Sequence, residues 1–289
     1  MNSWIPAATD LEGFRASQRL AYRCAETIAG ELKPGITERE TAARMKSWLL
    51  EQGVNDWFHQ PFAWFGDRTA FTGFGGIGHF GGFNPAFYSS GRKLEQRMPF
   101  ILDCAPCKNG YTADIGYCGV IGENKLLDQL MDDLLEYRNL ILDLVKQRRL
   151  LSEVSQAVDR LCAKHGYEPR HKAYPFQVLA HRVEKLEDDH KKSHMAVMRF
   201  GVRNITELLR DAWGPGRKEG WSPLWSSEHR SDHPPTPGLW AVEPHLGFRG
   251  VGAKWEELLV VTENDAFWLD EDVPHVRRWV ARGLLEQAA

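Results

Sequence analysis

The stretch ILDCAPCKNGYTADIGYC, residues 101–118, holds two cysteines, two aspartates and an Asn-Gly turn within one apolar segment. Asn109-Gly110 between two β-prone runs is the strongest short-range signal for a β-hairpin, and we expect that hairpin over residues 99–121. Two functions compete for the segment. The cysteines could form half of a zinc-thiolate site, or the aspartates could form one wall of a carboxylate metal site.

The two aspartates are predicted to point the same way from adjacent strands. Counting back from the turn puts Ala105 opposite Asp114, and Asp103 lies on the same face as Ala105. Diagonal neighbours sit about 7–8 Å apart at the backbone, which two short side chains can span with a metal between them. The alternative is that both face solvent. The flanking PFIL and IGYCGVIG sequences favour burial, and aspartate is rarely buried unpaired, so we interpret both as metal ligands.

The cysteines fit a zinc site poorly. Structural zinc needs about four ligands, and the chain has no second C-x-x-C or C-x-x-H pair to join Cys104 and Cys107. Strand alternation also puts Cys104 on the face opposite Asp103. The five cysteines are an odd number scattered through a large chain, which argues against a secreted disulfide framework and predicts reduced thiols.

Composition limits the classes of protein. The chain has 289 residues, 43% of them apolar, which is enough to bury the core of one large domain, residues 1–289. Net charge is −3, with acidic and basic residues interspersed, so we expect no nucleic-acid or membrane partner. The N-terminus resembles no signal peptide, which predicts a cytoplasmic protein. A small molecule or short peptide is the expected partner, and a homodimer is the candidate assembly.

The first half of the chain is expected to run helix, helix, strand, strand. Apolar spacing predicts an amphipathic helix over 10–32. Thr37 and Glu40 form a capping box that begins a second helix, which ends at Gly53. The aromatic, β-prone residues 55–72 then precede the hairpin.

The second half repeats this order of elements. A long helix is expected over 124–150, and another begins at Ser152 and ends at Gly166. Strand-like sequences follow at 175–183, 238–248 and 254–269. The chain is therefore predicted to be an α/β (α+β) domain with pseudo-symmetric halves, 1–123 and 124–289. Residues 211–239, rich in Gly, Pro, Ser and Trp, are interpreted as a lid loop.

Three motifs resemble one family. DCAPCKNGYTAD (103–114), WAVEP (240–244) and GVGAKWEELLVVTEN (250–264) are similar to those of the pita-bread metallopeptidases. That family includes methionine aminopeptidase, aminopeptidase P, prolidase and the metal-free creatinase. The likeness extends from LKPGITERE (32–40) to VVTEND (260–265). It implies the pita-bread fold, α-α-β halves around a curved antiparallel sheet, in a short form without the family's extra N-terminal domain.

The resemblance implies a ligand set for two divalent metal ions. Asp103 and Asp114 match the family's aspartates, Glu243 and Glu256 match its glutamates, and His181 matches its histidine by position. Oxygen-rich donors with one imidazole suit manganese, iron, cobalt or zinc. Four negative charges need about two divalent cations for balance, and such a pair activates water and polarises a carbonyl group.

The family's other site residues are harder to match. The second catalytic histidine is assigned to His190, with His194 as the alternative. The upstream substrate-binding histidine is assigned to His59 or His79. Trp64, with Trp57, Phe58 and Phe65, indicates an aromatic-lined substrate pocket.

These residues predict a dinuclear metal-dependent hydrolase. Glu243 would relay a proton and a histidine, His181 or His190, would stabilise the oxyanion. The expected reaction is cleavage of a short peptide or peptide-like amide near its N-terminus, as an aminopeptidase or Xaa-Pro dipeptidase. Two alternatives stay open. One is a metal-dependent reaction, with iron among the candidate metals, on a non-peptide metabolite. The other is an inactive binding module.

Overall fold

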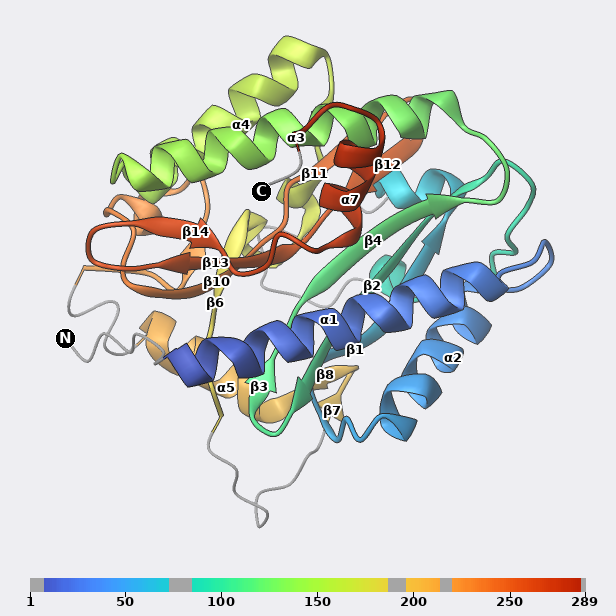
Figure 1. Cartoon of the computed structure of the whole chain (residues 1–289), viewed down its shortest axis with the longest axis horizontal. Helices are drawn as coiled ribbons and strands as arrows, with labels where there is room; N and C mark the ends of the chain where they lie inside the picture. Colours follow the sequence, from blue (N-terminus) through green and yellow to red (C-terminus); the bar gives the residue numbers. More distant parts are fainter. Residues whose placement is uncertain (1–7, 73–84, 187–195, 214–219, 287–289) are drawn as a thin grey trace.

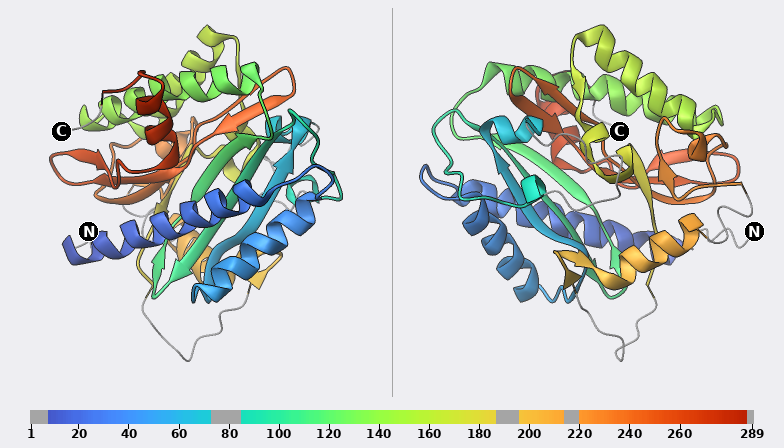
Figure 2. Two further views of the ribbon diagram at one scale, coloured as in Figure 1. Left: turned by 45° about the vertical axis from the view of Figure 1, so that its right-hand side comes forward. Right: turned by 180° about the vertical axis from the view of Figure 1, so that it is seen from behind.

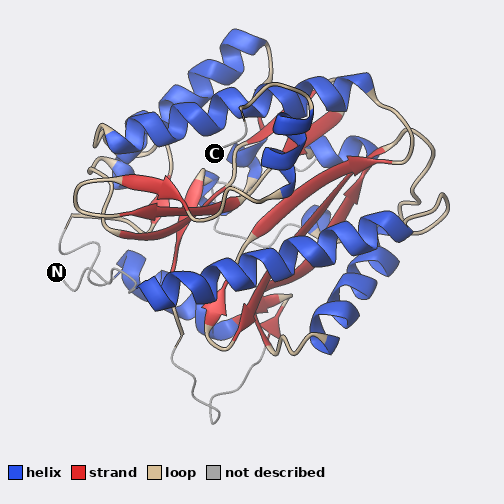
Figure 3. Cartoon of the chain, viewed as in Figure 1, coloured by secondary structure: helices blue, strands red, loops and turns tan. Residues whose placement is uncertain are grey.

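The computed structural model describes residues 8–72, 85–186, 196–213 and 220–286 (Figure 1). Helices lie on the outside of antiparallel strands that meet in the middle of the molecule (Figure 3). The helices are α1 (Ala8–Glu31), α2 (Glu38–Glu51), α3 (Lys125–Lys146), α4 (Leu151–His165), α5 (Val202–Trp213) and α7 (Pro274–Ala281), together with five short 3-10 turns. The predicted mixed α/β class with antiparallel sheets is confirmed.

Fourteen strands in the described residues form three sheets. The strands are β1 (Asp56–Phe65), β2 (Pro99–Lys108), β3 (Tyr111–Thr112), β4 (Ile115–Val120), β5 (Glu168–Pro169), β6 (Ala180–Val183), β7 (Ala196–Val197), β8 (Phe200–Gly201), β9 (Leu224–Trp225), β10 (Gly238–Val242), β11 (His245–Phe248), β12 (Val251–Lys254), β13 (Glu257–Val261) and β14 (Ala266–Trp268). Their orders are β3-β2-β1-β8-β7 with β4 on β2, β14-β13-β10-β6-β9, and β12-β11-β5.

The hairpin has the register expected from its turn. Lys108 pairs with Tyr111 and Asp103 with Gly116, so β2 keeps one register along β3 and β4. Asn109 and Gly110 have φ values of 53° and 81°, as a two-residue hairpin turn of type I′ requires. The chain leaves the ladder around Asp114, between β3 and β4, and then resumes it.

Helices α1 and α2 lie along the same side of the long strands β1 and β2 (Figure 2). The capping box that was expected to begin α2 is present, because the Glu40 backbone N–H donates to Thr37 Oγ1 and the Thr37 backbone N–H donates to the Glu40 carboxylate. Such a box satisfies two backbone donors that the helix itself leaves unpaired.

Helices α3 and α4 lie over the strands of the second half, where α3 packs against β12 and β14 (Figure 1). Asn124 caps α3, and Gly166 ends α4 in the left-handed conformation with φ 72°, which only glycine adopts without strain. Strand β12 also contacts β2 and β4. This contact brings the acidic residues of the two halves together.

The stretch 211–239 differs from the unbroken loop that the sequence analysis expected. Its first residues complete α5, and within it β9 pairs with β6 as an edge strand. Trp225 is fully buried against Trp240. An apolar side chain in the core, rather than a periodic pattern, holds this part of the chain in place, and its role as a lid stays a prediction.

Strands β7 and β8 were also not expected, and they extend the first sheet with residues from the second half of the sequence, because β8 pairs with β1. The division into halves at residue 123 stays a prediction. Within the described ranges, no helix is long and apolar enough to cross a membrane.

Candidate metal centre

Asp103 and Asp114 converge, as the hairpin register predicted. Both are almost fully buried, at 3% and 2% exposure. Asp103 lies on β2 and Asp114 follows β3. His59 of β1 links them, because its Nε2 lies 3.2 Å from one oxygen of each carboxylate.

Two buried histidines contact different oxygens of the Asp114 carboxylate. His59 Nε2 lies 3.2 Å from Asp114 Oδ1, and His181 Nε2, on β6, lies 3.3 Å from Asp114 Oδ2. Each ring places its Nδ1 near the backbone carbonyl of the next residue, Gln60 at 3.1 Å and Arg182 at 3.2 Å. A donated Nδ1–H at these positions leaves both Nε2 atoms as ligands.

Two glutamates and a lysine complete the cluster. Glu243 follows β10, and Glu256 comes directly before β13. Lys254, the last residue of β12, donates through Nζ to Asp103 at 2.8 Å, Glu243 at 3.0 Å and Glu256 at 2.9 Å. The lysine side chain is buried, at 3% exposure. Three buried carboxylates therefore share one ammonium group, and the fourth, Asp114, contacts the two histidines.

The electrostatics reflect this excess of carboxylates. Burial raises the pKa of Glu256 well above its usual range, and the nearby Asp114 and Glu243 carboxylates raise it further. Burial also raises the pKa of Glu243. Burial opposes ionisation of Asp114 too, but His59 and His181 outweigh it and lower the pKa of Asp114. Burial opposes protonation of His59, but Asp114 and Asp103 outweigh it and raise the pKa of His59 to about 9.

Gly116 makes room for the lysine. It pairs with Asp103 across the hairpin, and a Cβ atom at this position would lie 2.4 Å from Lys254 Cε. No real side chain tolerates such a contact, so the glycine in the sequence DIGYC is required by the passage of Lys254 over β4.

The donor atoms fit divalent metal. Among the described residues, two groups have donors within 4.8 Å of one another, His59 with Asp103 and Asp114, and Asp114 with His181 and Glu256. Carboxylate and imidazole donors suit manganese, iron, cobalt or zinc. Neither group contains cysteine. All five cysteines are buried and free, and burial raises the pKa of the Cys107 thiol to about 11, so the described residues give the zinc-thiolate alternative no support.

Trp64 was expected to line a substrate pocket, and the structure places it in the core instead. Its side chain is 1% exposed, and its Nε1–H donates to the Phe87 carbonyl. The Phe62 ring lies between Trp64 and His59, with centroid distances of 5.6 and 5.2 Å. A buried ring behind another ring cannot contact substrate without rearrangement of the core.

Several assigned histidines lie outside the described residues, namely His79, His190 and His194. Their roles stay predictions.

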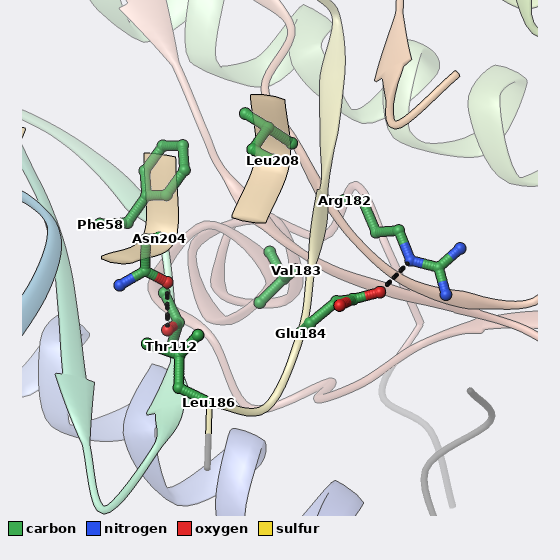
Figure 4. Close-up of a pocket in the computed structure, with 8 residues that line it drawn as sticks. All are labelled: Phe58, Thr112, Arg182, Val183, Glu184, Leu186, Asn204 and Leu208. Atoms are coloured by element: carbon green, nitrogen blue, oxygen red, sulfur yellow. Dashed lines mark hydrogen bonds and ion pairs between the residues drawn. The ribbon is translucent and has the colours of Figure 1, made fainter. Parts of the chain in front are cut away.

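A small pocket has residues of β1 and β6 in its lining, among them Phe58 and Arg182 (Figure 4). Phe58 lines one side of it and stacks on the His181 ring, with a centroid distance of 4.5 Å and an interplanar angle of 7°. Arg182 and Glu184 line the other side and form an ion pair at 2.8 Å, and Asn204 lies beside Phe58. The pocket thus has an aromatic wall and an ion pair in its lining, and Phe58 connects it to the cluster by stacking on His181.

Sequence reasoning missed Lys254. The residue lies two positions before Glu256, and alternation along an extended segment puts residues i and i+2 on the same face. The pattern Lys-Trp-Glu therefore indicates that Lys254 and Glu256 lie on one face, and Trp255, at 1% exposure, is turned into the core. The count of four negative charges at the predicted site did not include the positive charge of Lys254.

Residues 12–263 match Metallopeptidase family M24. An uncharacterized peptidase of Staphylococcus aureus (strain bovine RF122 / ET3-1) is 22% identical over 164 residues, which cover 56% of this chain and 43% of that protein. The chain therefore spans less than half the length of that relative.

Solved structures show the same fold. The X-Pro aminopeptidase from Thermotoga maritima MSB8 superposes with a TM-score of 0.65 at 17% identity, over 92% of this chain and 62% of that one. The prolidase from Pyrococcus furiosus superposes with a TM-score of 0.64 at 18% identity, over 92% and 65% of the respective chains. Together with the family match, these likenesses confirm the pita-bread fold that the sequence motifs implied.

Proposed function

Because the chain belongs to Metallopeptidase family M24, we propose that it is a metal-dependent peptidase that hydrolyses a short peptide or peptide-like amide near the peptide's N-terminus. The observation that carries this proposal is the buried set of four carboxylates around Asp114, which Lys254 neutralises only in part. Buried charges of one sign cost several kcal/mol each unless cations compensate them.

The residues that would hold divalent ions are Asp103, Asp114, His181, Glu243 and Glu256, and the donor set fits manganese, iron, cobalt or zinc. When bound, such ions supply a nucleophile at neutral pH and polarise the carbonyl group of the substrate. Two ions per chain are proposed, as expected from the sequence.

The chain's own groups would position the substrate and move the proton. Lys254 holds Glu243 by Oε2 at 3.0 Å, so we assign proton transfer from water to the leaving amine to Glu243 Oε1. His181 is fixed by its contact with Arg182 and by the stacked Phe58 ring. A ring held in this way orients its Nε2 toward the metal position beside Asp114 without further reorganisation.

The pocket that Phe58 lines has a volume of about 20 Å³, which is room for about one water molecule, so it is not proposed as the peptide site. Phe58, which stacks on His181, is the described residue that we propose contacts an apolar side chain of the substrate. The names of the Thermotoga and Pyrococcus proteins favour peptides with proline in the second position as the first substrates to test.

The test is cleavage of Xaa-Pro and Met-Xaa peptides by manganese-loaded protein, with Asp114→Asn beside the wild type. We expect cleavage by the wild type and at least about a 1,000-fold loss of kcat/KM in the variant, because Asp114 belongs to both donor groups. His229→Ala is the matched control, since that side chain is exposed and lies outside the cluster.

Metal binding without cleavage of any peptide would contradict the peptidase and favour a reaction on a non-peptide metabolite. Neither metal binding nor cleavage would favour an inactive binding module. The homodimer and the cytoplasmic location stay predictions of the sequence.

A further inference from the structure

We propose that His59 is a metal ligand that holds a second divalent ion together with Asp103 and Asp114. The inference rests on the proposed metal-dependent function. It changes the predicted ligand set, in which His181 is the one histidine and His59 contacts the substrate. It also divides the cluster into two ion positions that share Asp114.

The first support is the matching placement of His59 and His181 about Asp114. Each histidine approaches a different oxygen of Asp114 through Nε2, at 3.2 and 3.3 Å. Each has its Nδ1 beside the carbonyl of the following residue. This second contact is the usual way in which a protein sets the tautomer and orientation of a metal-binding imidazole. Since His181 occupies the position of the family's ligand, the same arrangement at His59 indicates the same role.

The second support is the length of the contacts. His59 Nε2 lies 3.2 Å from both Asp103 Oδ1 and Asp114 Oδ1. Charge-assisted bonds from a cationic nitrogen to a carboxylate measure about 2.7–2.9 Å, as Lys254 shows in the same cluster at 2.8 Å to Asp103. An octahedral ion about 2.1 Å from its ligands sets neighbouring donor atoms about 3 Å apart. The His59 contacts fit shared coordination better than an ion pair.

The third support is the backbone of β1. His59 pairs with Ala105, and the register of β1 against β2 shifts on both sides of it, between Trp57 and His59 and between His59 and Phe62. Such bulges turn a side chain away from the direction that regular alternation would give it, and they are over-represented next to active sites. The irregularity coincides with the one residue of β1 that reaches both aspartates.

The test is metal content. Chelator-treated protein is dialysed against excess manganese, and bound metal per chain is measured by elemental analysis for the wild type, His59→Ala and His229→Ala. We expect two ions in the wild type and in His229→Ala, and one in His59→Ala, held by Asp114, His181 and Glu256. Circular dichroism spectra confirm that each variant is folded.

The outcomes separate this inference from the proposed function. Two ions in His59→Ala with unchanged affinity would overturn the inference, because His59 would then be only an ion-pair partner of the aspartates. One ion per chain in the wild type would overturn the inference on His59 but would leave the proposal of a metal-dependent enzyme intact. No metal in the wild type would overturn the proposed function and the inference together.

A second measurement needs no variant. Cobalt-loaded wild-type protein is examined by proton NMR for hyperfine-shifted, slowly exchanging ring N–H signals. The two buried histidines, with Nδ1 beside the Gln60 and Arg182 carbonyls, should give two such signals if both bind cobalt. A single signal would overturn the assignment of His59, whether or not His59→Ala folds.

Discussion

Two neighbouring glutamates, Glu256 and Glu257, lie in opposite electrostatic environments. Both are buried, at 2% and 0% exposure. Glu257 accepts from Arg138 Nε at 2.6 Å and lies 2.9 Å from His275 Nε2. Burial opposes ionisation of Glu257, but Arg138 and His275 outweigh it and lower its pKa. At Glu256, burial and three further carboxylates, those of Asp114, Glu243 and Asp103, raise the pKa instead.

The difference separates a structural ion cluster from a functional one. On the Glu257 side, the protein supplies its own cation, so the charge is compensated by folding alone. On the Glu256 side, one lysine faces three carboxylates, and a fourth contacts two histidines. An uncompensated buried cluster is the better indication of a binding site, because the missing charge must come from outside the chain.

Removal of the cation that pairs with Glu257 should have the largest effect on stability. Arg138→Met removes the guanidinium and leaves Glu257 buried without its main partner, so we expect a loss of about 3–5 kcal/mol in the free energy of unfolding. Urea denaturation measures this loss, with the exposed Arg23→Met as control. A loss below about 1 kcal/mol would mean that Glu257 is not held as an ion by Arg138.

Removal of Lys254 tests the charge balance among the carboxylates around Glu256. Lys254→Met should destabilise metal-free protein by about 2–4 kcal/mol, because three carboxylates lose their shared cation. Excess manganese should restore part of the loss in the variant, as ligand binding to the native state does. Denaturation with chelator and with manganese measures both effects, and Lys33→Met, at an exposed position, is the control. An unchanged stability in chelator would show that the carboxylates do not depend on the ammonium group.

Neutralising the two glutamates one at a time should have opposite effects. In metal-free protein, Glu256→Gln removes a repelled charge and should raise the free energy of unfolding by about 1–2 kcal/mol, whereas Glu257→Gln should lower it by about 2–3 kcal/mol. Thermal unfolding in chelator measures both. Two changes of the same sign would contradict the contrast between the sites.

A third carboxylate, that of Asp159, gives a further comparison at a position outside the candidate metal site. Burial opposes ionisation of Asp159, but its contacts with His171 and Lys172 lower its pKa from 3.8. A carboxyl group with a lowered folded pKa stabilises the protein above its unfolded pKa and loses that contribution as pH falls through the folded value. Asp159→Asn should therefore cost about 1 kcal/mol at neutral pH and less below about pH 4. Urea denaturation at the two pH values checks this, and a cost that grows in acid would contradict it.

Local patterns predicted the elements of the fold well. The capping box of Thr37 and Glu40, the glycine at 166 and the Asn109-Gly110 turn each act over a few residues, and the structure shows all three. Strands β7 and β8 were missed, because pairing with β1, rather than a periodic sequence, defines them. Helix α5 was missed although its sequence is strongly amphipathic.

The candidate site was predictable where the chemistry lies within one hairpin. Asp103 and Asp114 follow from the register of a single turn. The contact of Lys254 with Asp103 joins residues 151 positions apart, which no local pattern specifies. Trp64 was assigned to a pocket because composition cannot distinguish an aromatic core from an aromatic surface.

The sequence by itself determined the helices that carry their own caps, the hairpin register and the family motifs that mark the acidic residues. Only the tertiary structure decided which charges compensate one another. Glu256 and Glu257 are adjacent in the chain, yet alternation along an extended segment sends them into different clusters. Electrostatic energy depends on distance in space and on burial, and both exist only once β12 has packed against β2 and β4.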